Sequence, residues 1–330
     1  MPHILLTGAG FSRNWGGWLT NEAFEYLLGC SEVDSDIRDL LWSHSGNYEN
    51  ALDELQSAFR EKPDNITRDR LSKLQNAISA MFADMNKAFA SAQFEFHHPV
   101  GPEYWVRSFL MRFDAIFTLN HDLLLEPHYF DSGFGRPEYS VYRKWGGCQI
   151  PGMEPLPPEG MQPYKMNWVP MDSPEFMLQP NRQPYFKLHG SSNWIDDRWG
   201  REMLIMGGNK VFSIAEHPIL MWNYERFREY LAIPHTRLMV IGYSFRDEHI
   251  NNAIGAAADA GALKLFIVDP DGVDVLDREF RKNIFWKNSS ERGPLLKRFQ
   301  NHLIGASRRT LRDIFSGDTV EHGKVMRFFD

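Results

Sequence analysis

The stretch HILLTGAGFS, residues 3–12, decides the fold because it joins a short apolar run to a glycine-rich turn. An apolar run without alternation that ends in such a turn is typical of a buried strand. Gly8 and Gly10 would let a pyrophosphate approach the backbone, and the amides that follow would point at it. The third glycine of a G-x-G-x-x-G fingerprint is missing, so this stretch alone favours a tight strand–helix turn without a ligand.

Four later apolar runs resemble the first in length and character. They lie at residues 115–119, 185–188, 238–241 and 265–268. Stretches with helical spacing lie between or after them, at residues 105–113, 218–231, 247–260 and 294–315. Strands without clean alternation, separated by helices, indicate an α/β fold with a Rossmann-like parallel sheet that helices cover on both faces.

Two segments differ from this alternation of strands and helices. Residues 21–97 follow a helical pattern and predict a helical insertion packed beside the sheet. Residues 133–184 are rich in proline, glycine and aromatic residues, which fits a functional lid and a well-packed irregular excursion equally well. We expect a single domain over residues 1–330, which ends in C-terminal helices over residues 294–330.

Composition narrows the function classes. The net charge of −7 gives no whole-protein field that would attract a phosphate backbone, so direct nucleic-acid binding is not expected. Cys30 and Cys148 are too few for a disulfide framework or a four-thiolate zinc site, and we expect two free thiols. The N-terminus lacks the features of a signal peptide, and no apolar run reaches the ~20 residues of a membrane span, so we expect a cytoplasmic protein.

Polar residues follow each of the apolar runs. The tips are Gly8–Ser12, Asn120-His121-Asp122, His189-Gly190, Gly242-Tyr243-Ser244 and Asp269. In doubly wound sheets, ligands bind at the carboxyl ends of the strands, so these tips should line one crevice. Taken one at a time, each tip has a plainer explanation: asparagine and aspartate cap turns, and a single histidine is more often packed than catalytic.

Together and in order, the tips resemble the motifs of the sirtuin family. Sirtuins carry a GAG-x-S turn, here Gly8-Ala9-Gly10-Phe11-Ser12, and an N-x-D strand end, here Asn120-His121-Asp122. They also carry an L-H-G tripeptide with the catalytic histidine, here Leu188-His189-Gly190, and a G-x-S strand end, here Gly242-Tyr243-Ser244. Three longer stretches are similar to sequences of the bacterial sirtuin-like proteins of antiphage defence. They are FTLNHDLLLE, KLHGSSNW and IGYSFRDEHIN.

This resemblance implies an NAD glycohydrolase that uses NAD as substrate and depletes it when activated. It implies catalytic roles for Asn120, Asp122 and His189. The residues that it implies for NAD binding are Gly8, Ala9, Gly10, Phe11, Ser12, Gly242, Tyr243, Ser244 and Asp269. Two cysteines cannot supply the zinc module of the protein-deacylating members, so we expect no zinc and no other metal.

The sequence also raises expectations about partners and leaves alternative functions open. The resemblance suggests a homo-oligomer and a separate sensor or ATPase subunit. One alternative is a module that binds NAD or ADP-ribose without cleaving it, and a less favoured one is an NAD-dependent protein deacylase. A Rossmann enzyme that transfers a hydride is a further possibility, which NADH formation would detect.

Overall fold

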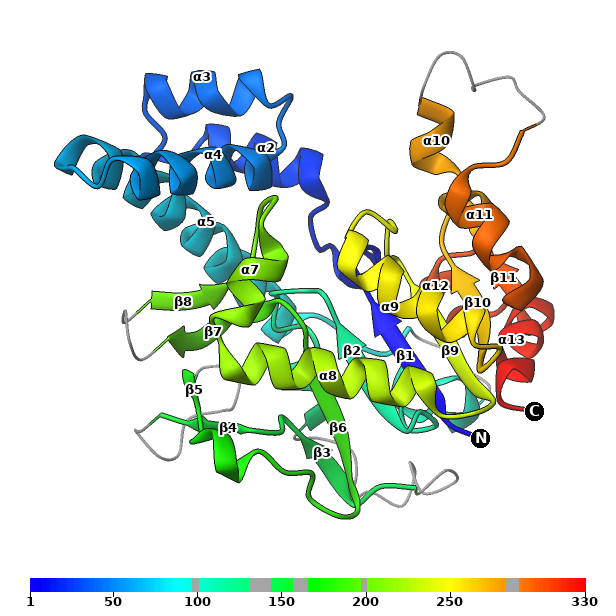
Figure 1. Cartoon of the computed structure of the whole chain (residues 1–330). Coiled ribbons are helices and arrows are strands. Elements are labelled where there is room, and N and C mark those ends of the chain that lie inside the picture. The colour runs from blue at the N-terminus through cyan, green and yellow to red at the C-terminus, as the bar shows by residue number, and fades with distance from the viewer. Residues whose placement is uncertain (97–100, 131–143, 157–165, 197–200, 283–290) are drawn as a thin grey trace.

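The central feature of the computed structural model is a parallel sheet (Figure 1). The structure describes residues 1–96, 101–130, 144–156, 166–196, 201–282 and 291–330. Within them, seven strands pair in the order β11-β10-β9-β1-β2-β6-β3, and each neighbouring pair is parallel. Their bounds are β1 His3–Thr7, β2 Ala115–Thr118, β3 Gly147–Gln149, β6 Arg182–Lys187, β9 Thr236–Ile241, β10 Leu263–Val268 and β11 Leu303–Ser307. The predicted parallel α/β sheet is confirmed.

Helices cover both faces of this sheet because alternate strand residues point to opposite sides. Ile4 and Leu6 of β1 pack in one core layer with helices α8 (Pro218–Ala232), α9 (Glu248–Asp259) and α11 (Pro294–Phe299). Leu5 packs in the other layer with α6 (Val106–Leu110), α12 (Leu311–Ser316) and α13 (Thr319–Met326). The strands are buried on both sides, which explains why they read as continuous apolar runs.

The segment at residues 21–97 is helical, as predicted, over its described part. Its helices are α2 (Thr20–Leu28), α3 (Ser35–Ser43), α4 (Tyr48–Glu61) and α5 (Asn65–Ser91). Asp34 and Asn47 cap the starts of α3 and α4, where their side chains accept backbone N–H bonds. Residue 97 and the three that follow lie outside the described residues. Figure 1 shows these helices beside the sheet, on the side of its carboxyl ends.

The C-terminal part differs from the expectation. The predicted helix over residues 294–315 is wrong at its centre, where strand β11 pairs in parallel with β10. Pairing with an existing sheet edge outweighs the weak helical preference of this short stretch. Helices α12 and α13 follow, and Thr310 starts α12 with a capping box to Asp313.

The segment at residues 133–184 contains short strands that its composition did not reveal. Strands β4 (Met153–Pro155) and β5 (Trp168–Pro170) form a second sheet with β7 (Gly190–Asp196) and β8 (Arg201–Leu204), in the order β4-β5-β7-β8. Met153 and Trp168 pack in the apolar cluster around buried Trp194. The described part of this segment is therefore packed, and residues 131–143 and 157–165 lie outside the described residues.

The remaining helices are short connections. They are α1 (Ala9–Ser12), η1 (Arg13–Trp15), η2 (Pro102–Tyr104), η3 (Glu126–Phe130), η6 (Ser173–Glu175), α7 (Lys210–Ala215), η7 (Gly272–Leu276), α10 (Arg278–Lys282), η8 (Gln300–His302) and η9 (Arg327–Phe329). Among the described helices, none combines the length and the apolar character that crossing a bilayer requires. Both cysteines are free.

Candidate functional site

The order of the strands places a cleft at the carboxyl ends of β1 and β9. From β1 the chain builds outward through β2 and β6, and it then returns to the other side of β1 with β9, β10 and β11. Ligands of doubly wound sheets bind at such a switch point. A cleft of about 1220 Å³ opens here, and every sequence-predicted site residue except Phe11 lines it.

Two glycine turns pack directly against each other at the floor of the cleft. The Gly10 amide donates to the Gly242 carbonyl at 2.9 Å. A Cβ on Gly8 would lie 2.6 Å from the Gly242 oxygen, and a Cβ on Gly10 would lie 2.7 Å from the Gly242 Cα. The close packing of the two turns therefore explains by itself why glycine is needed at both positions. Contact of these glycines with a ligand stays a prediction.

Phe11 lies apart from the other residues of its motif. Its ring is buried and contacts the ring of Trp15, and its amide donates to the Gly8 carbonyl at 2.8 Å. The amide that was expected to face a pyrophosphate is thus already bonded within the turn.

A chain of hydrogen bonds joins the tip of β1 to the tip of β2. The Asn120 amide nitrogen donates to the Gly8 carbonyl and to Ser12 Oγ, both at 3.0 Å. Ser12 Oγ in turn donates to Asp122 Oδ2 at 2.8 Å. Because a carbonyl only accepts, this contact fixes the orientation of the Asn120 amide. Both N–H groups of Asn120 are then used, which leaves its Oδ1 as the group available to a ligand.

The Asp122 carboxylate is nearly enclosed at the side of the cleft. Asp122 is 7% exposed, and its Oδ1 accepts a hydrogen bond from the Leu124 amide at 3.0 Å. Burial raises the pKa of Asp122, and the nearby Lys187 ammonium opposes this rise. Both carboxylate oxygens accept a hydrogen bond, Oδ2 from Ser12 and Oδ1 from the Leu124 amide, and acceptance at both oxygens favours the ionised form.

Lys187 connects the tips of β2 and β6 from beneath. Its ammonium is fully buried and donates to the Asp122 carbonyl at 2.6 Å and to Ser191 Oγ at 2.7 Å. It also forms a buried ion pair with Glu126 Oε1 at 2.8 Å. The Lys187 ammonium therefore ties the backbone at Asp122 to the side chain of Ser191, two residues after His189.

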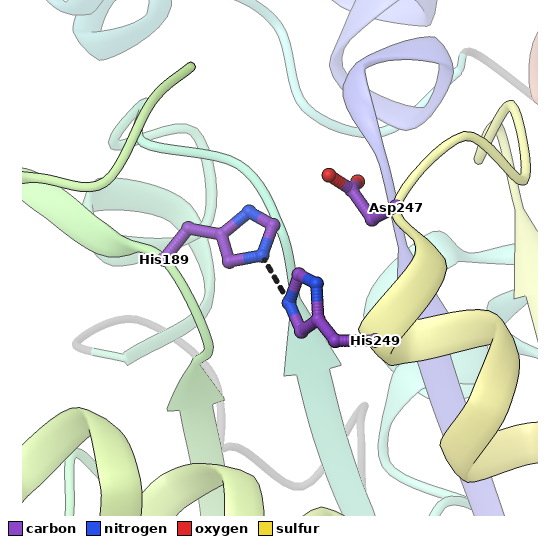
Figure 2. A group of neighbouring side chains, drawn as sticks. All are labelled: His189, Asp247 and His249. Carbon is purple, nitrogen blue, oxygen red and sulfur yellow. Dashed lines mark hydrogen bonds between the residues drawn. The ribbon is translucent and has the colours of Figure 1, made fainter. Parts of the chain in front are cut away.

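His189 occupies the turn between β6 and β7 and is 2% exposed. Its Nε2 lies 3.1 Å from the Nε2 of His249, which is at the start of α9 (Figure 2). Burial lowers the pKa of His189 well below its ordinary value, and the Lys210 ammonium and His249 add to this effect. These effects favour the neutral imidazole, in which one ring nitrogen keeps a lone pair that can accept a hydrogen bond or a proton.

Asp269 marks the β10 side of the cleft. Its Oδ1 accepts the Asp271 amide at 2.9 Å and the Arg278 guanidinium at 2.6 Å. Burial raises the pKa of Asp269, and Arg278 opposes this effect. Tyr243 is also buried, and its hydroxyl bonds Asn251 at 3.1 Å, so this side chain supports α9 while its turn lines the cleft.

Sequence reasoning missed several charged or ionisable residues of this region, and four of them matter most for its geometry. Asp247, His249 and Lys210 line the cleft, and Lys187 lies beneath it. Asp247 and His249 belong to the stretch IGYSFRDEHIN, whose polar residues after the strand end were a usable signal. A lysine inside the apolar run of β6 was a second signal, because an unpaired buried charge is very costly.

Comparisons with known proteins give the family. A search of the curated proteins finds no match. A mutant Sir2 homologue solved in complex with ADP-ribose is 12% identical over 99% of this chain and 93% of that chain, with a TM-score of 0.43. Sir2Tm bound to a propionylated peptide is 11% identical over 98% of this chain and 94% of that chain, with a TM-score of 0.39.

The family model for the SIR2-like domain matches residues 114–292, which is more than half of the chain. This range contains the tips with Asn120 and His189, and it also contains the Gly242 turn. The chain belongs to the family of SIR2-like domains.

Proposed function

We propose that this chain binds NAD in the cleft and hydrolyses it to nicotinamide and ADP-ribose. The observation that carries the proposal is the convergence of Asn120, Asp122 and His189 on one cleft at the switch point of the sheet. These residues come from strand ends far apart in the sequence, and the order of strands in a SIR2-like sheet brings them together.

The reaction requires stabilisation of positive charge on a sugar. When the nicotinamide–ribose bond breaks, its electron pair leaves with nicotinamide, which becomes neutral, and the ribose becomes an oxocarbenium ion. A water molecule then adds to the ribose carbon and releases one proton. A carboxylate held nearby in a mostly dry site stabilises such a cation, because the protein need not reorganise as the charge develops. Asp122 fits this role, since Ser12 and the Leu124 amide hold its two oxygens.

Asn120 and His189 then have separate tasks. The free Oδ1 of Asn120 accepts a hydrogen bond from a ribose hydroxyl or from the attacking water, and so orients it. The neutral imidazole of His189 accepts the proton that the water or a ribose hydroxyl releases.

The test is nicotinamide release from NAD, followed by mass spectrometry for the wild type, Asn120→Ala and His189→Ala. We expect the rate to fall roughly a hundredfold or more in each variant, as for loss of a general base or an orienting group. His217→Ala is the matched control, because His217 pairs with Asp196 at 2.9 Å and does not line the cleft. Full activity in both cleft variants would refute the assignment.

The same measurement separates the alternatives. Binding of NAD without turnover, with and without proteins encoded beside this chain, would identify a binding module. Turnover of an acyl-lysine peptide that requires NAD would identify a deacylase. From the resemblance, we also propose that NAD depletion serves antiphage defence in the cytoplasm, in a homo-oligomer that a sensor or ATPase subunit controls.

A further inference from the structure

Three side chains bring metal-ligating atoms together in the cleft. They are His189, His249 and Asp247, and one ligand atom of each lies within 4.8 Å of the others. Figure 2 shows the two imidazole rings facing each other, with the Asp247 carboxylate on the same side of α9 as His249. Two elements contribute, the turn before β7 and the first turn of α9, so the group is a product of the fold.

The spacing of the two imidazole nitrogens suits a tetrahedral metal ion. Two nitrogens that bind zinc at about 2.0–2.1 Å lie about 3.3 Å apart in a tetrahedral site. The Nε2 atoms of His189 and His249 are 3.1 Å apart, so these two ligands require only a small displacement. The ligand atom of Asp247 lies within 4.8 Å of the other two, so its side chain has to move closer to complete the site. In the bound state each Nε2 directs its lone pair at the metal, and each ring carries its proton on Nδ1.

The backbone of the two ligands at the start of α9 is held from outside the group. Tyr224 donates its hydroxyl to the His249 carbonyl at 3.1 Å, and the Tyr243 hydroxyl accepts the Asp247 amide at 3.1 Å. His189 is buried, at 2% exposure. Ligands whose supports are already in place lose little conformational freedom when a metal binds.

The local charge permits a cation despite a nearby lysine. Lys210 lies 2.8 Å from Asp247 Oδ1 and 3.0 Å from Glu49 Oε2. Two carboxylates around one ammonium leave a net negative charge beside the two neutral imidazoles. A divalent ion that coordinates Asp247 therefore meets a compensated site.

We propose that His189, His249 and Asp247 form a binding site for a divalent transition metal of the zinc class. Imidazole nitrogens with one carboxylate select such ions over magnesium or calcium, which prefer sites of oxygen ligands alone. Three protein ligands leave a fourth position open to the cleft, as zinc sites with an exchangeable ligand do. The expectation of no metal rested on the cysteine count, and this set of ligands contains no cysteine.

A metal at this site would silence the cleavage of NAD. This consequence rests on the proposed function, in which His189 accepts a proton. A histidine whose Nε2 lone pair coordinates a metal cannot accept a proton at that atom, and the metal adds positive charge where the oxocarbenium ion develops. Zinc thus acts as a reversible inhibitor that competes for a residue of the catalytic group.

Metal binding is tested directly, without NAD. The full chain is purified with chelator and titrated with Co²⁺, whose visible absorption reports tetrahedral nitrogen and oxygen ligands, and with Zn²⁺ by calorimetry. We expect one site in the wild type, and affinity that falls roughly tenfold or more in His249→Ala and in Asp247→Asn. His44→Ala is the control, because half-buried His44 pairs with Glu54 outside the cleft and should leave the affinity unchanged.

The outcomes distinguish the site from the proposed function. No tetrahedral Co²⁺ spectrum in the wild type, or equal affinity in wild type and both cleft variants, would overturn the metal site even if NAD is cleaved. One-site binding that requires His249 supports the site even if no NAD is cleaved. Where cleavage is present, zinc should inhibit the wild type, and the inhibitory concentration should rise at least roughly tenfold in His249→Ala. Equal inhibition of both proteins would refute silencing through this site.

Discussion

Replacing Lys187 with methionine tests whether the buried ammonium holds the cleft together. The substitution keeps an unbranched side chain of similar length and removes only the charge and its three hydrogen bonds. In the wild type those bonds run to the Asp122 carbonyl, Glu126 Oε1 and Ser191 Oγ, at 2.6–2.8 Å. Glu126 is 1% exposed, and its other oxygen, Oε2, already has no hydrogen-bond partner.

The expected loss follows from what Lys187→Met leaves behind. Removing one partner of a buried ion pair strands the other charge, which costs about 3–5 kcal/mol in the free energy of unfolding. The double variant Lys187→Met/Glu126→Leu removes both charges. It leaves mainly the Asp122 carbonyl without its donor, a loss of about 1–3 kcal/mol. The double variant should therefore be more stable than the single variant.

The assay is unfolding in guanidinium chloride at pH 7.5, with tryptophan fluorescence as the signal. Lys282→Met is the matched control, because the exposed pair of Lys282 and Glu279 should contribute at most about 1 kcal/mol. A further check is the pH dependence of Lys187→Met. Burial already raises the pKa of Glu126, and loss of Lys187 raises it further, so the defect should shrink as the pH falls and Glu126 is protonated. A double variant that is less stable than the single variant would refute the reasoning.

Three other perturbations follow from the same geometry. Gly242→Ala should lower the free energy of unfolding by more than about 3 kcal/mol, because φ of Gly242 is +64° and a Cβ there would lie 2.3 Å from the Phe11 amide nitrogen. A native circular dichroism spectrum with unchanged stability would contradict this prediction. Ser12→Ala should slow nicotinamide release roughly tenfold, since Asn120 and Asp122 lose their shared hydroxyl, and an unchanged rate would argue against that link. Burial lowers the pKa of His121 to about 3, so below pH 6.5 the unfolded chain takes up a proton that the folded chain excludes. For each pH unit by which the pH is lowered below about 6.5, this group should reduce the free energy of unfolding by about 1.4 kcal/mol. The urea midpoints at pH 7 and pH 5 should therefore differ less in His121→Gln than in the wild type.

The sequence was sufficient for the parts of the fold that depend on local pattern. Buried parallel strands are continuous apolar runs, and five of them were located from those runs. The meeting of Asn120 with the Gly8 turn also followed, because the carboxyl ends of parallel strands share one edge. Strand β11 was missed because its stretch, LIGAS, has no strand signature and becomes a strand only by pairing with β10.

For the candidate site, the sequence predicted single residues but not the contacts between residues that are far apart in the chain. His189 was predicted from the tripeptide around it, whereas its neighbour His249 lies 60 positions later in a helix. Lys187 and Glu126 are 61 positions apart, and only the folded sheet shows that they neutralise each other. Such pairs follow from strand order and register, which one sequence does not reveal.

The central position of β1 has a consequence for biosynthesis. Ile4 pairs with Ala115 on one side and with Leu238 on the other. Strand β1 therefore cannot have both of its edges covered until β9, which pairs with it from Arg237 to Ile241, has also been made. Contacts so distant in sequence slow folding and keep an apolar edge exposed to aggregation. We expect efficient production in a heterologous host to depend on chaperones that shelter nascent chains.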